Sequence, residues 1–125
     1  MKTVLAIINI DKMNETKRAL LDAGIASMTA SGRVFGRGKG LWEAKVLEGV
    51  KENSPEALEL LGKEPRLRPQ RVLEIVVNDS FVQPCVDAII DVNQGEPHGC
   101  GKIFVLPITD VIQVRTGDSG SKAVD

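Results

Sequence analysis

Two strand–helix–strand units predict an α+β fold, the ferredoxin-like βαββαβ arrangement with a four-stranded antiparallel sheet and both helices on one face. One unit lies before residue 31 and the other after residue 70, and a long polar segment separates them. A chain of 125 residues is long enough for one core but not for two. We therefore expect one domain over residues 1–117, followed by a flexible tail over residues 118–125.

The first unit begins with an almost wholly apolar strand over residues 3–10, which suits a central position in the sheet. Asn14 is the expected N-cap of a helix over residues 15 to 22 or 23, and Gly24 then ends that helix. Small and β-branched residues over residues 25–30 predict the second strand.

The second unit repeats the order, with an apolar strand over residues 71–77 and a helix over residues 80–92. Strands over residues 103–108 and 111–115 complete the sheet. Because the strands are so apolar, the face opposite the helices needs cover, and association with copies of the chain is the natural solution.

A segment of mostly polar residues joins the two units. Ser54 as N-cap and Pro55 at the first helical position predict a short helix over residues 54–62. A connection of about 30 residues is far longer than the usual link of 2–6 residues, so we expect it to be functional, mobile or both.

Composition excludes several classes of function. The net charge is −1, and the chain has no tyrosine, one tryptophan and one histidine, which counts against base-stacking nucleic-acid modules and histidine-based catalysis. No apolar run approaches the ~20 residues that cross a bilayer, so no membrane insertion is expected. Cys85 and Cys100 stand alone, without a ligand cluster, and two lone thiols indicate a reduced, cytoplasmic protein with no bound metal.

Three segments combine glycines with cations, and each falls at the edge of a predicted strand. They are Phe35-Gly36-Arg37-Gly38-Lys39-Gly40, Gly99-Cys100-Gly101-Lys102 and Gln113-Val114-Arg115-Thr116-Gly117. Each segment alone is more often a solvated loop. Together, open backbone amides and guanidinium groups form an anion site that favours a phosphate-bearing ligand.

No catalytic set accompanies these segments. His98 has no partner carboxylate or nucleophile at a useful spacing, so a solvated loop residue is favoured. Glu74 either faces the site or points to solvent at the sheet edge. Cys85 is expected to be a small core residue. Trp42, on the long segment, is either a local packing anchor or an exposed contact for a partner protein, and its place on a long loop slightly favours the partner contact.

The chain resembles the PII signal-transduction proteins, the trimeric sensors of nitrogen status. The resemblance covers nearly the whole chain outside the long segment, and several motifs carry it in one order and spacing. They include Phe35-Gly36-Arg37 and Gly99-Cys100-Gly101-Lys102, within residues 6–8, 19–29, 35–40, 74–77, 85–90, 99–105 and 111–117.

The resemblance implies a homotrimer that binds ATP or ADP in clefts between subunits, and many family members also bind 2-oxoglutarate beside Mg-ATP. Carried over by position, the adenine would lie among Ile7, Thr29 and Val76. The remaining nucleotide-binding positions would surround the phosphates: Arg37, Gly99, Gly101, Lys102 and Arg115. The family's mobile T-loop would be about residues 36–68, with Gly36, Gly38, Lys39 and Gln70 at its base.

Three departures from the family pattern bear on the ligands. Gly38 stands where the family has the glutamine that holds Mg and 2-oxoglutarate, Gln70 replaces a lysine, and Gln113 replaces an arginine. ATP binding is therefore better supported than 2-oxoglutarate binding in the usual geometry. Either Arg68 or Arg71 could supply the missing positive charge.

The T-loop is longer than usual and lacks the tyrosine that many bacterial members modify. It resembles the PII-like proteins encoded with nitrogenase, which act as a pair of subunits and inhibit nitrogenase by direct binding, and the chain is similar to the second, longer member of that pair. This branch implies a homotrimer, or a hetero-oligomer with a second PII-like subunit, that is not an enzyme. One alternative is a general PII regulator of an ammonium transporter or a biosynthetic enzyme. A small enzyme that uses Lys102 and Arg115 on a phosphorylated substrate is a weaker alternative.

Overall fold

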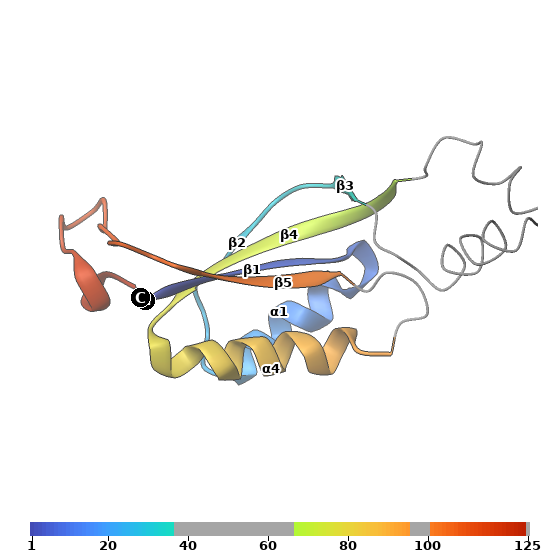
Figure 1. Ribbon diagram of the computed structural model, residues 1–125, viewed down its shortest axis with the longest axis horizontal. Coiled ribbons are helices and arrows are strands. Elements are labelled where there is room, and N and C mark those ends of the chain that lie inside the picture. Colours follow the sequence, from blue (N-terminus) through green and yellow to red (C-terminus); the bar gives the residue numbers. More distant parts are fainter. Residues whose placement is uncertain (37–66, 96–100, 125) are drawn as a thin grey trace, which may run out of the picture.

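The computed structural model describes residues 1–36, 67–95 and 101–124. In that part of the chain, an antiparallel sheet carries the helices α1 (Met13–Asp22) and α4 (Val82–Asn93) on the same face (Figure 1). The order and pairing of the elements confirm the predicted ferredoxin-like α+β fold. The T-loop interior and the helix predicted over residues 54–62 lie outside the described residues.

Strand β1 (Lys2–Asn9) is central, as its apolar sequence predicted. It pairs antiparallel with β4 (Arg68–Val77) on one side and with β5 (Lys102–Pro107) on the other. Residues that face each other across antiparallel strands share a face of the sheet, and successive residues alternate between faces. This register therefore determines which side chains share the surface opposite the helices.

The second strand differs from the prediction, because it is divided into β2 (Thr29–Ala30) and β3 (Val34–Gly36). Both pair with β4, so they occupy one strand position at its outer edge. Ile25, expected in this strand, is a core residue whose backbone N–H donates to the Leu20 carbonyl at 2.9 Å. Its backbone hydrogen bond thus completes the helix end rather than a strand.

Ser31 lies in the gap between β2 and β3 and keeps the chain attached to β4. Its backbone N–H donates to the Val72 carbonyl at 2.9 Å, and its hydroxyl accepts from the Val72 N–H at 2.9 Å. The serine side chain therefore satisfies a backbone donor of β4 where the strand ladder is interrupted.

The helix termini also differ in detail from the prediction. A 3-10 turn, η1 (Ile10–Lys12), precedes α1, and the N-cap position is Lys12 rather than Asn14. Gly24 follows the helix with φ of 85°, as expected for a glycine that ends a helix. A second 3-10 turn, η2 (Asp79–Phe81), precedes α4.

The core lies between the helices and the inner face of the sheet. Cys85 is fully buried there, as predicted for a small core residue. Asn93 of α4 is also buried, and its Nδ2 donates to Thr16 Oγ1 of α1 at 3.1 Å. The apolar members of the core are Val4, Ala6, Ile8, Met13, Leu20, Ile25, Leu73, Ile75, Val77, Cys85 and Ile89.

The C-terminal residues are arranged differently from the sequence prediction. No strand forms over residues 111–115, all of which the structure describes, and only an isolated bridge joins Ile112 to Ser119. Residues 118–125 were expected to be a flexible tail. Their described part instead contains the 3-10 helix η3 (Gly120–Ala123), and both Ala123 and Val124 are buried. The Asn78 side chain donates to the Ser121 carbonyl at 3.3 Å, which attaches this segment to the end of β4.

The sheet face opposite the helices carries apolar side chains that remain partly open to solvent. Phe104 and Leu106 of β5 are each 45% exposed, and Leu5 and Val76 are half-buried. Within the described ranges, no helix has both the length and the apolar character needed to cross a membrane.

Candidate functional site

Lys102 and Ile7, two of the predicted nucleotide-binding residues, face each other across β5 and β1. Because they are paired, both lie on the open face of the sheet, away from the helices. Lys102 is exposed and Ile7 is half-buried. The pair therefore combines an available cation with an adjacent aliphatic surface.

Gly101 determines how closely the start of β5 approaches β1. It has φ of 101°, and a Cβ atom at this position would overlap the Ile7 carbonyl oxygen. Only glycine accommodates both the backbone conformation and this contact. The glycine thus places Lys102 in register at the first position of β5. Gly99 lies outside the described residues.

The structure also brings together two residues of the predicted T-loop base, Gly36 and Gln70. The pairing of β3 with β4 places Gly36 opposite Arg68 and Val34 opposite Gln70. The Gln70 side chain extends over Gly36, so that a Cβ at Gly36 would overlap Gln70 Oε1. Gln70 is only 6% exposed, so this amide is a buried component of the base.

Side chains alternate between the two faces of the sheet along β4, and this distinguishes Arg68 from Arg71 as the source of the missing positive charge. Arg68 lies on the same face as Gln70 and is exposed. Arg71 lies on the opposite face, and its Nε donates to the Ser31 carbonyl at 3.0 Å. Of these two arginines, Arg68 is therefore the one on the open face of the sheet. The sequence could have identified it, because alternate residues of β4 from Val76 back to Arg68 share one face.

The other predicted residues of the T-loop base lie outside the described residues. They are Arg37, Gly38 and Lys39, together with Trp42 on the segment itself. Their roles stay predictions: nucleotide binding for Arg37, the base of the T-loop for Gly38 and Lys39, and partner binding for Trp42.

Thr29 and Val76 form a second group on the open face, separate from Ile7 and Lys102. Thr29 pairs with Glu74, and Val76 pairs with Thr3 of β1. Ile7 pairs with Val72, four residues from Val76, so the two groups lie ~13 Å apart along the strand. A single chain therefore does not surround one adenine with all three predicted residues.

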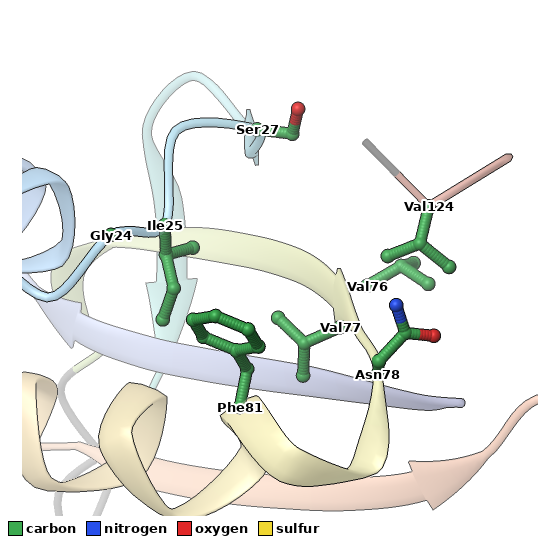
Figure 2. A pocket seen from close by; sticks show the side chains of 8 residues that line it. All are labelled: Gly24, Ile25, Ser27, Val76, Val77, Asn78, Phe81 and Val124. Carbon is green, nitrogen blue, oxygen red and sulfur yellow. The ribbon is translucent and has the colours of Figure 1, made fainter. Parts of the chain in front are cut away.

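Val76 also lines a small pocket at the end of β4. Figure 2 shows Val124 of the C-terminal segment beside Val76, with Phe81 and Ile25 on the other side. The remaining lining residues are Gly24, Ser27, Val77 and Asn78. The buried C-terminal residues thus shape the surroundings of this second group.

Arg115 belongs to the same end of the sheet as Val76. The Ile108 N–H, just beyond β5, donates to the Met1 carbonyl at 3.3 Å, which fixes where the C-terminal segment begins. Lys102 lies at the other end of β5, a six-residue strand that spans ~20 Å. Arg115 and Lys102 of one chain are therefore too far apart to hold the same phosphate chain, and Arg115 is exposed in a turn.

Glu74 lies on the open face between Leu5 of β1 and Thr29 of β2, and it is exposed. Its carboxylate is therefore accessible from the side of the sheet that carries Ile7 and Lys102.

Two titratable groups away from Lys102 have altered acidity. A hydrogen bond of 2.9 Å from the N-terminal ammonium, aided by the charge of Lys2, lowers the pKa of Asp79. Burial raises the pKa of the Cys85 thiol to about 11. The first interaction attaches the chain start to η2, and the second keeps a core thiol protonated.

In the described ranges, no three His, Cys, Asp or Glu side chains lie close enough together to hold a metal ion. His98 and Cys100 fall outside those ranges.

The sequence of the chain is similar to those of known proteins of one family. A family model described as nitrogen regulatory protein P-II matches residues 1–118. The nitrogen fixation nifHD region GlnB-like protein 2 of Methanothermobacter marburgensis is 40% identical over 126 residues, which cover 99% of this chain and 100% of that protein. The protein of the same name in Methanococcus maripaludis is also 40% identical over 126 residues, with the same coverage. The nitrogen regulatory protein P-II of Nostoc punctiforme is 41% identical over 125 residues, 99% of this chain and 100% of that protein.

Proposed function

Because the chain belongs to the nitrogen regulatory protein P-II family, we propose that it senses nitrogen status by binding ATP or ADP between subunits and regulates nitrogenase. P-II proteins are regulatory signal proteins and are typically trimers. The proposal assigns the chain a regulatory role rather than a catalytic one.

The observation that carries the proposal is the position of Lys102, opposite Ile7 and directly after Gly101. An exposed ammonium group at the start of a strand suits a phosphate, and the neighbouring aliphatic side chain suits the base or sugar. Gly101 allows the backbone to approach closely at this point. These are the features that a nucleotide's phosphates require.

The separation within one chain supports a site that is shared between chains. Ile7 and Lys102 would contribute one wall, and Thr29, Val76 and Arg115 of a second copy would contribute the other. The ~20 Å span of β5 between Lys102 and the segment that carries Arg115 is too long for one phosphate chain, so two copies are required.

Binding of 2-oxoglutarate is the less supported part of the proposal. Gln70, a neutral amide, is buried over Gly36 at the T-loop base and carries no charge for a carboxylate. Arg68 is exposed on the same face and would supply a cation there. Mg would bind together with ATP, held by the oxygen atoms of its phosphates.

We propose that the bound nucleotide alters the T-loop, about residues 36–68, by a population shift. ATP and ADP differ at the γ-phosphate, so they would make different contacts with the T-loop base. A ligand that contacts one loop arrangement better than another increases the population of that arrangement. One of these arrangements would then bind the target protein.

The choice of nitrogenase as the target rests on the names of relatives from the nitrogen fixation nifHD region. The similar identity to a Nostoc protein named only nitrogen regulatory protein P-II favours a second candidate, a general regulator of an ammonium transporter or biosynthetic enzyme. Affinity capture from nitrogen-fixing cells distinguishes the two targets. The control is a variant of the chain that lacks residues 43–64. Recovery of a transporter without nitrogenase would refute the first.

Calorimetric titration with ATP, and then with 2-oxoglutarate in the presence of Mg-ATP, tests the ligand part. We expect ATP to bind with or without 2-oxoglutarate. Absence of binding by both ATP and ADP, in protein that is folded and oligomeric, would refute the proposed site.

A further inference from the structure

Residues 111–120 form a small hairpin that follows β5, and we call it the C-terminal hairpin. The Gln113 N–H joins its two arms by donating to the Asp118 carbonyl at 2.8 Å. The hairpin extends beyond the end of the sheet (Figure 1), and most of its residues are exposed, Arg115 among them. Because little of the hairpin is packed against the rest of the chain, its shape depends on its own hydrogen bonds.

Asp110 closes the base of the C-terminal hairpin. Its Oδ1 accepts hydrogen bonds from the backbone N–H groups of Val111 at 2.8 Å and Gly120 at 3.2 Å. The Gly120 N–H also donates to the Val111 carbonyl at 3.0 Å, so the two arms meet at this point. These bonds fix the base of the hairpin and involve none of the residues at its tip.

The tip, residues 113–118, is held by the side chain of Thr116. The Thr116 hydroxyl donates to Gln113 Oε1 at 2.6 Å, and it accepts from the Asp118 N–H at 3.2 Å. One hydroxyl group therefore joins a side chain of the first arm to the backbone of the second arm. Arg115 lies in the turn that these two hydrogen bonds close.

The Arg115 side chain itself forms no hydrogen bond or ion pair with any other residue of the described ranges, and it is exposed. We propose that Thr116 is a positioning residue for Arg115. Its hydroxyl, acting through Gln113, holds the backbone of the tip in the conformation from which the guanidinium group binds a nucleotide phosphate. This inference rests on the proposed nucleotide site, to which Arg115 contributes.

The physical reason is the entropy that binding costs. A guanidinium group binds a phosphate best through two parallel N–H donors, so the backbone that carries it needs a defined direction. An arginine on a loosely held turn loses conformational freedom when it binds, and this loss weakens the binding. The two bonds of the Thr116 hydroxyl order the turn before the ligand arrives. Thr116 thus contributes to affinity without touching the ligand.

The test is titration of the full chain with ATP, for the wild type, Thr116→Val and Thr116→Ser. Valine keeps the β-branched shape but removes both hydrogen bonds, so we expect the Kd for ATP to rise about 3- to 10-fold. Serine retains the hydroxyl and should bind within about twofold of the wild type. An unchanged Kd in Thr116→Val, or a Kd in Thr116→Ser as high as that of the valine variant, would overturn the inference.

A double-mutant cycle with Arg115→Ala separates positioning from a merely structural role. In the Arg115→Ala background, Thr116→Val should leave the Kd unchanged, because no guanidinium group is left to position. Competition against a fluorescent ATP analogue measures the weak binding of these variants. A rise in Kd as large as that in the wild-type background would show that Thr116 acts independently of Arg115, and it would overturn the inference.

Ser121→Ala is the matched control, because it removes a hydroxyl group of the same segment that bonds to no described residue. The contact of Ser121 with Asn78 uses the Ser121 backbone carbonyl. The control should bind ATP as the wild type does, and a rise in Kd equal to that of Thr116→Val would overturn the inference. Wild-type protein that binds neither ATP nor ADP would refute the proposed function and this inference with it. Wild-type binding with an unchanged Kd in Thr116→Val would refute the inference alone.

Discussion

Gly101 lies against the backbone of Ile7 so closely that a Cβ atom there would overlap the Ile7 carbonyl oxygen and stand 2.7 Å from the carbonyl carbon. The contact joins the residue just before β5 to the central strand of the sheet. Neither backbone segment can move away without breaking the pairing of Ile7 with Lys102. Gly101 thus connects the stability of the sheet to the position of the candidate phosphate-binding lysine.

Replacing Gly101 with alanine should therefore destabilise the fold strongly. The substitution imposes both a positive φ and a backbone clash, and we expect the free energy of unfolding to fall by roughly 3 kcal/mol or more. Gly117→Ala is the matched control, because Gly117 has φ of 75° but a Cβ atom added there would have no neighbour within 4 Å. That variant should lose only about 1–2 kcal/mol in urea denaturation. Equal losses would show that the Ile7 contact contributes nothing.

Lys102→Ala should weaken ATP binding without unfolding the protein. The change removes a charge-assisted contact worth roughly 1.5–3 kcal/mol, which corresponds to a rise in Kd of about 10- to 150-fold. Arg18→Ala is the control, because Arg18 is exposed on α1, on the other side of the sheet. Calorimetry measures both. An unchanged Kd in Lys102→Ala would remove this residue from the site.

The contact between Gly36 and Gln70 predicts a non-additive pair of substitutions. In Gly36→Ala the new methyl group displaces the Gln70 side chain, and crowding of this kind costs typically 1–3 kcal/mol. In the Gln70→Ala background the same change should cost less than half as much, because the obstructing amide is absent. Urea denaturation of the wild type, both single variants and the double variant measures the coupling energy. Additive losses would contradict the observed packing.

The sequence was sufficient for the sheet and its helices because apolar runs predict the buried strands, and capping and helix-ending residues predict where the helices begin and end. Val4, Ala6 and Ile8 lie in the apolar run that forms β1, and Gly24 ends the first helix as expected. The interruption at Ser31 was not predictable, because it depends on a side chain that replaces a ladder bond with β4. The local sequence pattern does not reveal that a side chain takes the place of a backbone hydrogen bond to a distant strand.

The C-terminal segment and the candidate site also combine features that the local sequence predicts with features that only the structure shows. Residues 111–115 alternate like a strand, but turn bonds such as Gly117 N–H to the Gln113 carbonyl hold them in a hairpin. The motif around Lys102 indicated a phosphate site from the sequence. Its separation from Arg115 follows only from the structure, in which Lys102 begins β5 and Arg115 lies in the segment that follows the other end of that strand. The sequence of one chain contains the residues of a candidate site, but it does not show which of them a second copy would contribute.

The buried thiol of Cys85 predicts a specific dependence of stability on pH. Burial raises its pKa from 9.0 to about 11, so the native state keeps the proton where the unfolded chain releases it. Below pH 9 both states are protonated and Cys85 adds no pH dependence. As the pH rises from 9 towards 11, the unfolded state is increasingly favoured, by up to about 1.4 kcal/mol per pH unit.

Urea denaturation at pH 8 and pH 10 measures this effect against Cys85→Ala, in which every other titrating group is retained. The wild type should lose about 1 kcal/mol more than the variant between the two pH values, because only the wild type has the buried thiol. Cys85 should also resist iodoacetamide in the native protein at pH 8, since its thiolate is scarce and its side chain is fully buried. Parallel pH profiles for the two proteins would show that Cys85 ionises equally in the folded and unfolded states.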